Sequence, residues 1–267
     1  MRSVPYIPER YMHVRSFCIP TIALPSLTAR ALPLLVIAMG CGASNAAAQV
    51  DKYPRMAAID EYQMEESAEI QLARSAAPTS ISRDATILVL GRQGYKTAVE
   101  GTNGFVCMVG RSWTAAFDWP EFWNPKVRAA DCMNAQAAHS ILPIALLRSR
   151  MVMAGRSKAE VLSAIKAAFV NGQVPTLESG AMDYMMSKAA YLTDEGDHNA
   201  PHLMFFTVGM DARNWGSGAA GSPVMSAPYW FFSAMEPSQM KGLPPILVFL
   251  VGVANWSDGT TAGMHAD

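Results

Sequence analysis

Residues 85–109 read Ala85-Thr-Ile-Leu-Val-Leu-Gly-Arg-Gln-Gly-Tyr-Lys-Thr-Ala-Val-Glu-Gly-Thr-Asn-Gly-Phe-Val-Cys-Met-Val109 and give the first indication of the fold class. The runs 85–90, 95–99 and 105–109 are rich in β-branched and aromatic residues, and glycine-containing turns separate them. Gly101-Thr-Asn-Gly104, between the second and third runs, is typical of a hairpin. The stretch therefore predicts an antiparallel meander of three strands.

Helical patterns flank this strand-forming block on both sides. Residues 56–77 place apolar side chains near helical spacing, acidic residues including Glu69 mark a solvent-facing side, and Pro78 ends the run. Beyond the strands, Ser140 is expected to cap a helix that has Pro143 in its first turn and ends near residue 153. We therefore expect one long amphipathic helix before the strands and further helices after them.

A capping box gives the clearest helix start in the chain. In Ser157-Lys-Ala-Glu160, the serine side chain accepts a hydrogen bond from the third amide while the glutamate reaches back to the cap. An apolar stripe follows, and Asn171-Gly172 ends the helix. Residues 181–192 predict a further helix.

Two later strands complete the expected domain. They are predicted at 203–208 and 246–253, with a Gly-, Ser- and Pro-rich loop at 214–228 between them. The order of strands, then helices, then strands favours the α+β class over alternating βαβ units. We expect one domain, with helices packed on an antiparallel sheet, because residues 49–267 suffice to build a single core.

The first 48 residues are typical of a cleaved signal segment. A basic stretch ends at Arg30, an apolar run follows at 31–41, and small residues close the segment at Ala46-Ala-Ala48. The apolar run is too short for a membrane-spanning helix but suits the central region of a signal peptide. We therefore expect cleavage before Gln49 and a mature domain in the periplasm, the cell envelope or the medium.

A second processing signal overlaps the first. Ile37-Ala-Met-Gly-Cys41 is similar to a lipobox, which would place a lipid anchor on Cys41 instead. The long stretch before the apolar run also leaves Met12 open as the true start. Lipoprotein signals usually carry leucine where this chain has Ala38, so cleavage after Ala48 remains our expectation and lipidation of Cys41 the alternative.

Composition narrows the function classes. A chain that is 51% hydrophobic and 16% charged is expected to fold. Four of the 21 basic and one of the 22 acidic residues lie in the first 48 positions, which leaves residues 49–267 with a formal charge near −4. This charge gives no footprint for nucleic acid or an anionic membrane, and we expect no transmembrane helix in the mature chain.

Cys107 and Cys132 are the only cysteines of the expected mature domain. In an oxidising compartment they are expected to form a disulfide, which stabilises a chain with a loop of this length by about 3 kcal/mol. The alternative is a pair of buried free thiols that behave as small hydrophobic residues.

Residues 194–202, Asp-Glu-Gly-Asp-His-Asn-Ala-Pro-His, hold two imidazoles and three carboxylates on a predicted loop before a strand. Such groups bind zinc or iron, or act as a base with its orienting acid. Pro201 keeps the two histidines off a common helix face, and no third metal ligand follows, so a solvated acidic loop with one structural histidine is the alternative. The candidate catalytic residues are His198, His202, Asp194 and Asp197.

Residues 113–123 hold five aromatic side chains with two acids among them. Such a segment suits a stacking platform for a flat ligand, with Trp113, Trp119 and Trp123 as the binding residues, or a surface shown to a protein partner. The alternative is a long loop that folds its aromatic side chains into the core.

Four segments resemble an uncharacterised group of exported bacterial proteins. They are residues 68–78, 103–107, 122–125 and 201–205, and the resemblance extends over most of the mature chain. It implies an exported protein but no activity, cofactor or catalytic residue. Small-molecule binding is our leading expectation for the function, with a hydrolase that uses the 194–202 loop and a protein-interaction module as alternatives.

Overall fold

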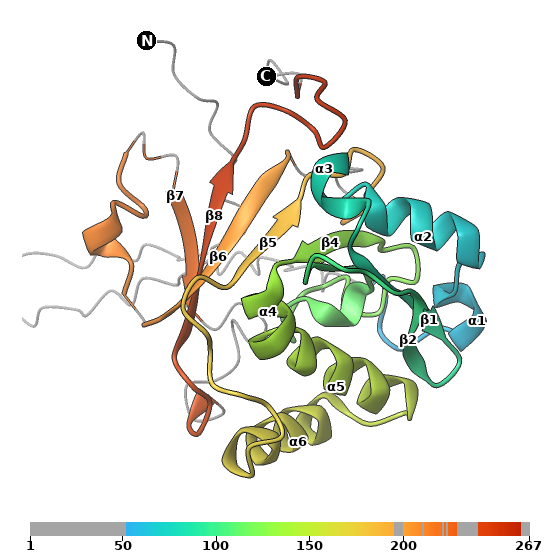
Figure 1. Cartoon of the computed structure of the whole chain (residues 1–267). Helices are drawn as coiled ribbons and strands as arrows, with labels where there is room; N and C mark the ends of the chain where they lie inside the picture. Colours follow the sequence, from blue (N-terminus) through green and yellow to red (C-terminus); the bar gives the residue numbers. More distant parts are fainter. Residues whose placement is uncertain are drawn as a thin grey trace, which may run out of the picture. The chain divides into compact units, whose positions relative to one another are not determined.

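The computed structural model describes residues 52–194, 200–209, 211–220, 222, 224–228 and 240–262, which form one α+β domain (Figure 1). Its centre is an eight-stranded sheet in the order β2-β1-β3-β4-β5-β6-β8-β7. Every neighbouring pair is antiparallel except β1 and β3, which are parallel. The predicted fold class is confirmed, with a mixed rather than a wholly antiparallel sheet.

The helices and strands are short. The helices are α1 Ile59–Tyr62, α2 Glu66–Arg74, α3 Thr79–Ser82, α4 Ala135–Ser140, α5 Leu142–Met153 and α6 Lys158–Val170, with 3-10 turns at Ser112–Thr114 and Arg213–Trp215. The strands are β1 Thr86–Gly91, β2 Gly94–Val99, β3 Val106–Gly110, β4 Ala129–Met133, β5 Met182–Met185, β6 His202–Val208, β7 Val224–Pro228 and β8 Ile246–Gly252.

The three-strand meander is wrong, because β3 pairs with β1 and not with β2. The hairpin turn is at Gly91–Gly94, whereas the Gly101–Gly104 segment crosses the start of β1. Gly101 lies so close to this strand that a Cβ atom there would be 2.1 Å from the Thr86 nitrogen. The reason is burial: β3 is almost wholly buried and needs two neighbours, whereas β2 is partly exposed and takes the edge.

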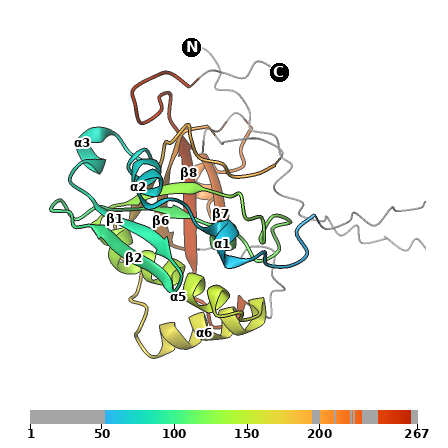
Figure 2. The same ribbon diagram turned by 90° about the vertical axis from the view of Figure 1, so that its right-hand side faces the viewer.

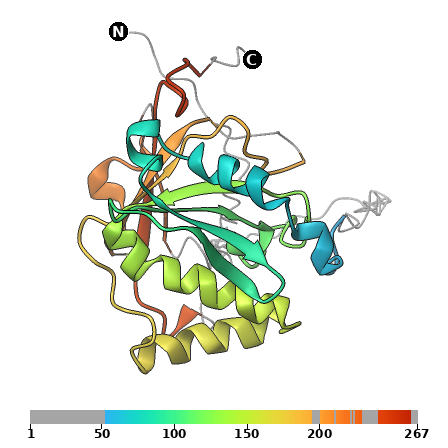
Figure 3. The ribbon, with the colours of Figure 1, turned by 45° about the vertical axis from the view of Figure 1, so that its right-hand side comes forward.

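The single helix expected at 56–77 is two helices. The chain is extended at Gln63, and α2 starts anew because the Glu65 side chain accepts a hydrogen bond from the Ala68 amide, 2.9 Å away. Glu69, assigned to the solvent side, is only 1% exposed. Figures 2 and 3 show α2 lying across one face of the β1–β3 region, with α1 set apart from it.

After the first strands, one predicted helix start is confirmed and three predictions are wrong. The capping box of α6 is present, with Ser157 and Glu160 satisfying each other's backbone amides. Ser140 does not cap α5; it ends α4, which Asn134 caps. Residues 182–185 form β5 rather than a helix, because strand pairing with β4 and β6 overrides their helix-forming composition. Strand β7 also lies inside the segment predicted as a loop.

Alternating side chains place one core on each face of the sheet. Cys107, Val109 and Cys132 pack with α2, while Met108 and Met133 pack with α4 and α5 on the opposite face. Cys107 and Cys132 face each other across β3 and β4 and form the predicted disulfide, with their Cα atoms 3.9 Å apart. None of the described helices has the length and apolar character needed to cross a membrane.

Candidate functional site

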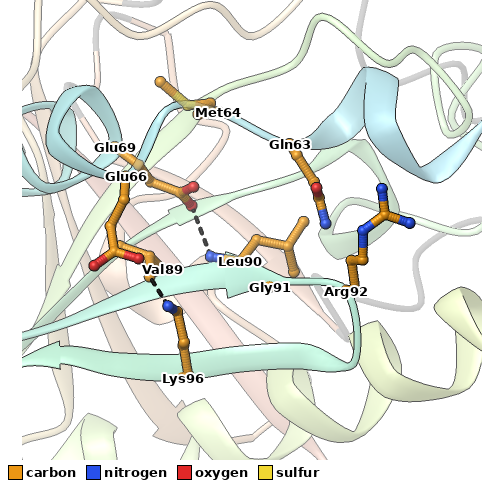
Figure 4. Close-up of a pocket in the computed structure, with 9 residues that line it drawn as sticks. All are labelled: Gln63, Met64, Glu66, Glu69, Val89, Leu90, Gly91, Arg92 and Lys96. Atoms are coloured by element: carbon orange, nitrogen blue, oxygen red, sulfur yellow. Dashed lines mark hydrogen bonds and ion pairs between the residues drawn. The ribbon is translucent and has the colours of Figure 1, made fainter.

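A depression of about 230 Å³ opens between α2 and the β1–β2 hairpin (Figure 4). Its floor includes Val89, Leu90 and Gly91 of β1, and Met64 adds apolar surface beside them. The polar residues around it are Gln63, Glu66, Glu69, Arg92 and Lys96. Because ligand pockets more commonly hold about 300–1,000 Å³, this depression fits only a small molecule.

A buried ion pair anchors the helix side of the depression. One Glu69 oxygen accepts hydrogen bonds from the Arg111 guanidinium, 2.8 Å away, and from the Leu90 amide, 3.1 Å away. Both charged side chains are at most 1% exposed. Glu69 therefore ties α2 to β1 and to the chain after β3, and Arg111 compensates its charge.

The break between α1 and α2 is held by two arginines. The Nε of Arg111 donates to the Tyr62 carbonyl, 2.6 Å away, while Arg128 donates to the carbonyls of Glu61 and Gln63. These are carbonyls at the end of a helix, which lack partners within it. Burial lowers the pKa of Arg128 to about 10, which leaves it a cation at neutral pH. Arg111 and Arg128 thus fix the backbone of the wall that Gln63 and Met64 form.

The rim of the depression carries charges of both signs. The Lys96 ammonium lies 2.7 Å from a Glu66 oxygen, and the Arg92 guanidinium lies 2.8 Å from an Asp60 oxygen. All four side chains are more than half exposed, so each pair is held weakly and can exchange its partner for a ligand at little cost. In Figure 4, Glu66 and Glu69 come from α2 and Lys96 from β2, on opposite sides of the floor.

The depression combines apolar surface with charged side chains. It offers an apolar floor, the side-chain amide of Gln63 and exchangeable charges on a rigid base. The residues that line it include neither a histidine nor a cysteine. Across the described part of the chain, no three His, Cys, Asp or Glu side chains lie close enough together to hold a metal ion. The chain matches no family model, no curated protein and no solved structure.

The candidate residues of the 194–202 loop lie in separate surroundings. Asp194 accepts hydrogen bonds from Lys52, Tyr53 and Tyr191, which lower the pKa of its carboxyl well below the usual range. His202 begins β6, where burial lowers the pKa of its imidazole and its Nδ1 lies 2.9 Å from the Ala200 carbonyl. The two are therefore parts of different hydrogen-bond networks.

The remaining two candidates, Asp197 and His198, lie outside the described residues. Asp194 joins the start of the domain to the segment that follows β5. The two residues that donate to it, Lys52 and Tyr53, lie more than 100 residues before it in the sequence. The hydrogen bond that Tyr191 donates to Asp194 raises the pKa of the Tyr191 hydroxyl to about 12. Asp194 and His202, the two candidates that the structure describes, have no hydrogen bond with each other.

The aromatic segment is mainly part of the core. Trp113 is fully buried, its ring lies 4.6 Å from that of Tyr62, and its Nε1 donates to the Ser149 hydroxyl. Phe117 and Phe122 are also buried, while Trp119 and Trp123 are half-buried. Trp113 therefore cannot serve as an open stacking surface, and the three tryptophans do not form one platform.

The residues around the depression were missed because their sequence signals are weak. Gly91 directly follows the predicted strand 85–90, and Lys96 lies in a predicted strand without a motif. Arg111 follows a buried strand directly, and a cation at such a position signals a buried partner. That signal does not identify Glu69, which is 42 residues away in sequence.

Proposed function

We propose that this chain is an exported protein that binds a small polar molecule in the depression between α2 and the β1–β2 hairpin. The observation that carries the proposal is the combination of an apolar floor with exchangeable charges held on a buried ion pair. A rigid base lets ligand binding proceed without the entropy cost of ordering the site. The size of the depression favours a molecule no larger than an amino acid or a short dicarboxylic acid.

The disulfide supports the exported part of the proposal, because structural disulfides persist mainly in oxidising compartments. We expect the exported protein to begin near Gln49 and to show no alkylatable thiol at Cys107 or Cys132 until it is reduced. Replacing both cysteines with alanine is expected to lower the free energy of unfolding by about 3 kcal/mol. N-terminal sequencing, alkylation mass spectrometry and urea unfolding test these points. Export as proposed would be contradicted by an uncleaved N-terminus at Met1 or Met12 in the exported fraction, or by two free thiols. A lipid on Cys41 would instead establish the other processing site.

Ligand binding is tested by titrating the folded domain with free amino acids, short dicarboxylic acids and inorganic phosphate, each followed by calorimetry. At least one of these probes is expected to bind, and Lys96→Ala is expected to weaken it about tenfold or more, as the loss of a charged hydrogen bond does. Arg156→Ala is the matched control, since it removes a similarly exposed ion pair outside the depression. The proposal fails if no probe binds, or if Lys96→Ala and Arg156→Ala bind equally well.

A further inference from the structure

The two halves of the sheet meet at a very short ladder. Strands β4 and β5 pair only at Cys132 with Tyr184 and at Met133 with Asp183. Just beyond Met133, Asn134 closes one end of the junction: its amide donates to the Met182 carbonyl, and its side-chain oxygen accepts from the Met182 amide. Between β2-β1-β3-β4 and β5-β6-β8-β7, few backbone hydrogen bonds therefore hold the sheet together.

At the other end, the chain after β5 leaves β4 and returns later. The Met186 amide donates to the Ala76 carbonyl at the end of α2, and the Ser187 hydroxyl lies 2.6 Å from that of Ser75. Pairing with the β4 side resumes only where Arg128 and Tyr191 exchange two backbone hydrogen bonds. The described residues of β5 and the segment 186–190 thus leave a gap beside residues 129–131.

Two carboxylates lie at this gap. Met133 is directly opposite Asp183, and side chains alternate along a strand, so Asp131 and Asp183 are diagonal neighbours on one face of the sheet. Such neighbours have Cα atoms about 7–8 Å apart, within mutual reach of two carboxyl groups. Asp183 is 1% exposed; its Oδ1 accepts a hydrogen bond from the Cys132 amide, 2.8 Å away, while its buried Oδ2 has no partner in the described structure.

Asp131 is held on its strand by Gly110 of β3. A Cβ atom at Gly110 would lie 2.9 Å from the Asp131 Oδ2, so the glycine gives the carboxyl group its room. The Asp131 side chain is therefore confined between β3 and the gap.

The charged groups around the two carboxylates are occupied elsewhere. On β2 and after β3, Tyr95 donates to the Val109 carbonyl and Arg111 is paired with Glu69. Arg128 binds backbone carbonyls before β4. From the elements on the other sides, His202 of β6 shares the same sheet face but contacts Ala200, His139 of α4 is paired with Glu178, and Arg148 of α5 packs on Phe117. No ion pair joins Asp131 or Asp183 to any of the described cations.

We propose that Asp131 and Asp183 form a pH-controlled latch on the β4–β5 junction, which is closed while the pair retains a proton and is released as the pair becomes doubly charged. Burial and the neighbouring carboxylate raise the pKa of Asp131 well above its ordinary value, and burial raises the pKa of Asp183 to about 7. When the junction opens, water reaches both groups and their pKa values return towards the ordinary carboxyl range of about 4.

The direction of the pH effect follows from these values. The closed junction binds a proton more tightly than the open one, so acid favours closure and rising pH favours opening. If opening releases one proton, the population of the open junction is expected to rise about tenfold for each pH unit between about pH 4 and pH 7. Repulsion between the two carboxylates then breaks the short β4–β5 pairing at Cys132–Tyr184 and Met133–Asp183, while the disulfide keeps β3 and β4 together.

Amide hydrogen exchange of the oxidised domain tests the latch between pH 5 and pH 7. After correction for the intrinsic exchange rate, protection of the amides in 182–191 is expected to fall about tenfold per pH unit. In Asp183→Asn the pH-dependent loss of protection is expected to be much smaller. The new side-chain carboxamide can still accept the hydrogen bond from the Cys132 amide, but it cannot ionise. Asp131→Asn is the second variant and is expected to act in the same direction.

Asp84→Asn is the matched control, because this carboxylate is exposed and precedes β1 on the far side of β3. It is expected to keep the wild-type pH dependence in 182–191. Equal protection of these amides at pH 5 and pH 7 in the wild-type protein would overturn the latch. So would a pH dependence that both asparagine variants leave unchanged.

Discussion

Replacing Glu69 with leucine is expected to lower the free energy of unfolding by about 3–5 kcal/mol, the cost of leaving a buried charge without its partner. Glu69 compensates the charge of the fully buried Arg111 and accepts a hydrogen bond from the Leu90 amide. The variant therefore leaves both buried donors without this acceptor. Urea unfolding followed by tryptophan fluorescence measures the loss.

Glu66 supplies the matched control, since it lies one turn away on the same helix and forms an exposed pair with Lys96. Glu66→Gln is expected to cost no more than about 1 kcal/mol. The double variant Glu69→Leu with Arg111→Met removes both buried charges and is expected to recover part of the stability. If Glu69→Leu costs as little as Glu66→Gln, the pair does not anchor α2 as described.

Replacing Trp113 with alanine is expected to cost about 3–5 kcal/mol, as large-to-small changes of buried aromatic residues do. The change leaves a cavity against Tyr62 and removes the donor to Ser149. Trp113→Phe separates these effects, because it keeps most of the ring volume and loses only the hydrogen bond, at about 1–3 kcal/mol. Thermal unfolding compares the three proteins.

Trp119 provides the comparison for this series, because it belongs to the same segment and is half-buried. Trp119→Ala is expected to cost clearly less than Trp113→Ala. A Trp113→Ala protein of wild-type stability that has lost a ligand would instead restore the stacking-platform hypothesis. The ordering of the two losses therefore decides between a core segment and a binding segment.

The strands that were predicted well are those whose burial follows from local sequence. Residues 203–208 and 246–253 are apolar along most of their length, and they form β6 and β8 almost as expected. The capping box of α6 succeeded for a similar reason, because its two side chains bind amides only three residues away. Local patterns predicted local contacts.

The errors came from contacts between distant segments. The helix break at Gln63 depends on Arg111 and Arg128, and β5 depends on pairing with β4 and β6. Neither dependence is visible within a window of neighbouring residues, where composition favours a helix in both cases. Tertiary structure overrode propensity at both places.

The candidate site could not be predicted for a related reason. Glu69 is an acid on a helix and Arg111 is a cation directly after a strand, and neither position shows which residue is its partner. The carboxylate-rich 194–202 loop drew attention because its groups are close in sequence. In the structure, Asp194 turns to Lys52 and Tyr53, whereas His202 is buried in β6. Proximity along the chain therefore did not bring Asp194 and His202 into contact.

The link between Cys107 and Cys132 encloses the whole aromatic segment in a covalent loop. The exposed Lys126 within this loop is a site for trypsin-like cleavage, which the protein would meet outside the cell if it is exported as we propose. A single cut there leaves both pieces joined through sulfur, with β3 and β4 still paired and the tryptophan core still enclosed. Damage to this loop is therefore expected to remain hidden on a non-reducing gel, and to release two fragments only after the bond is reduced.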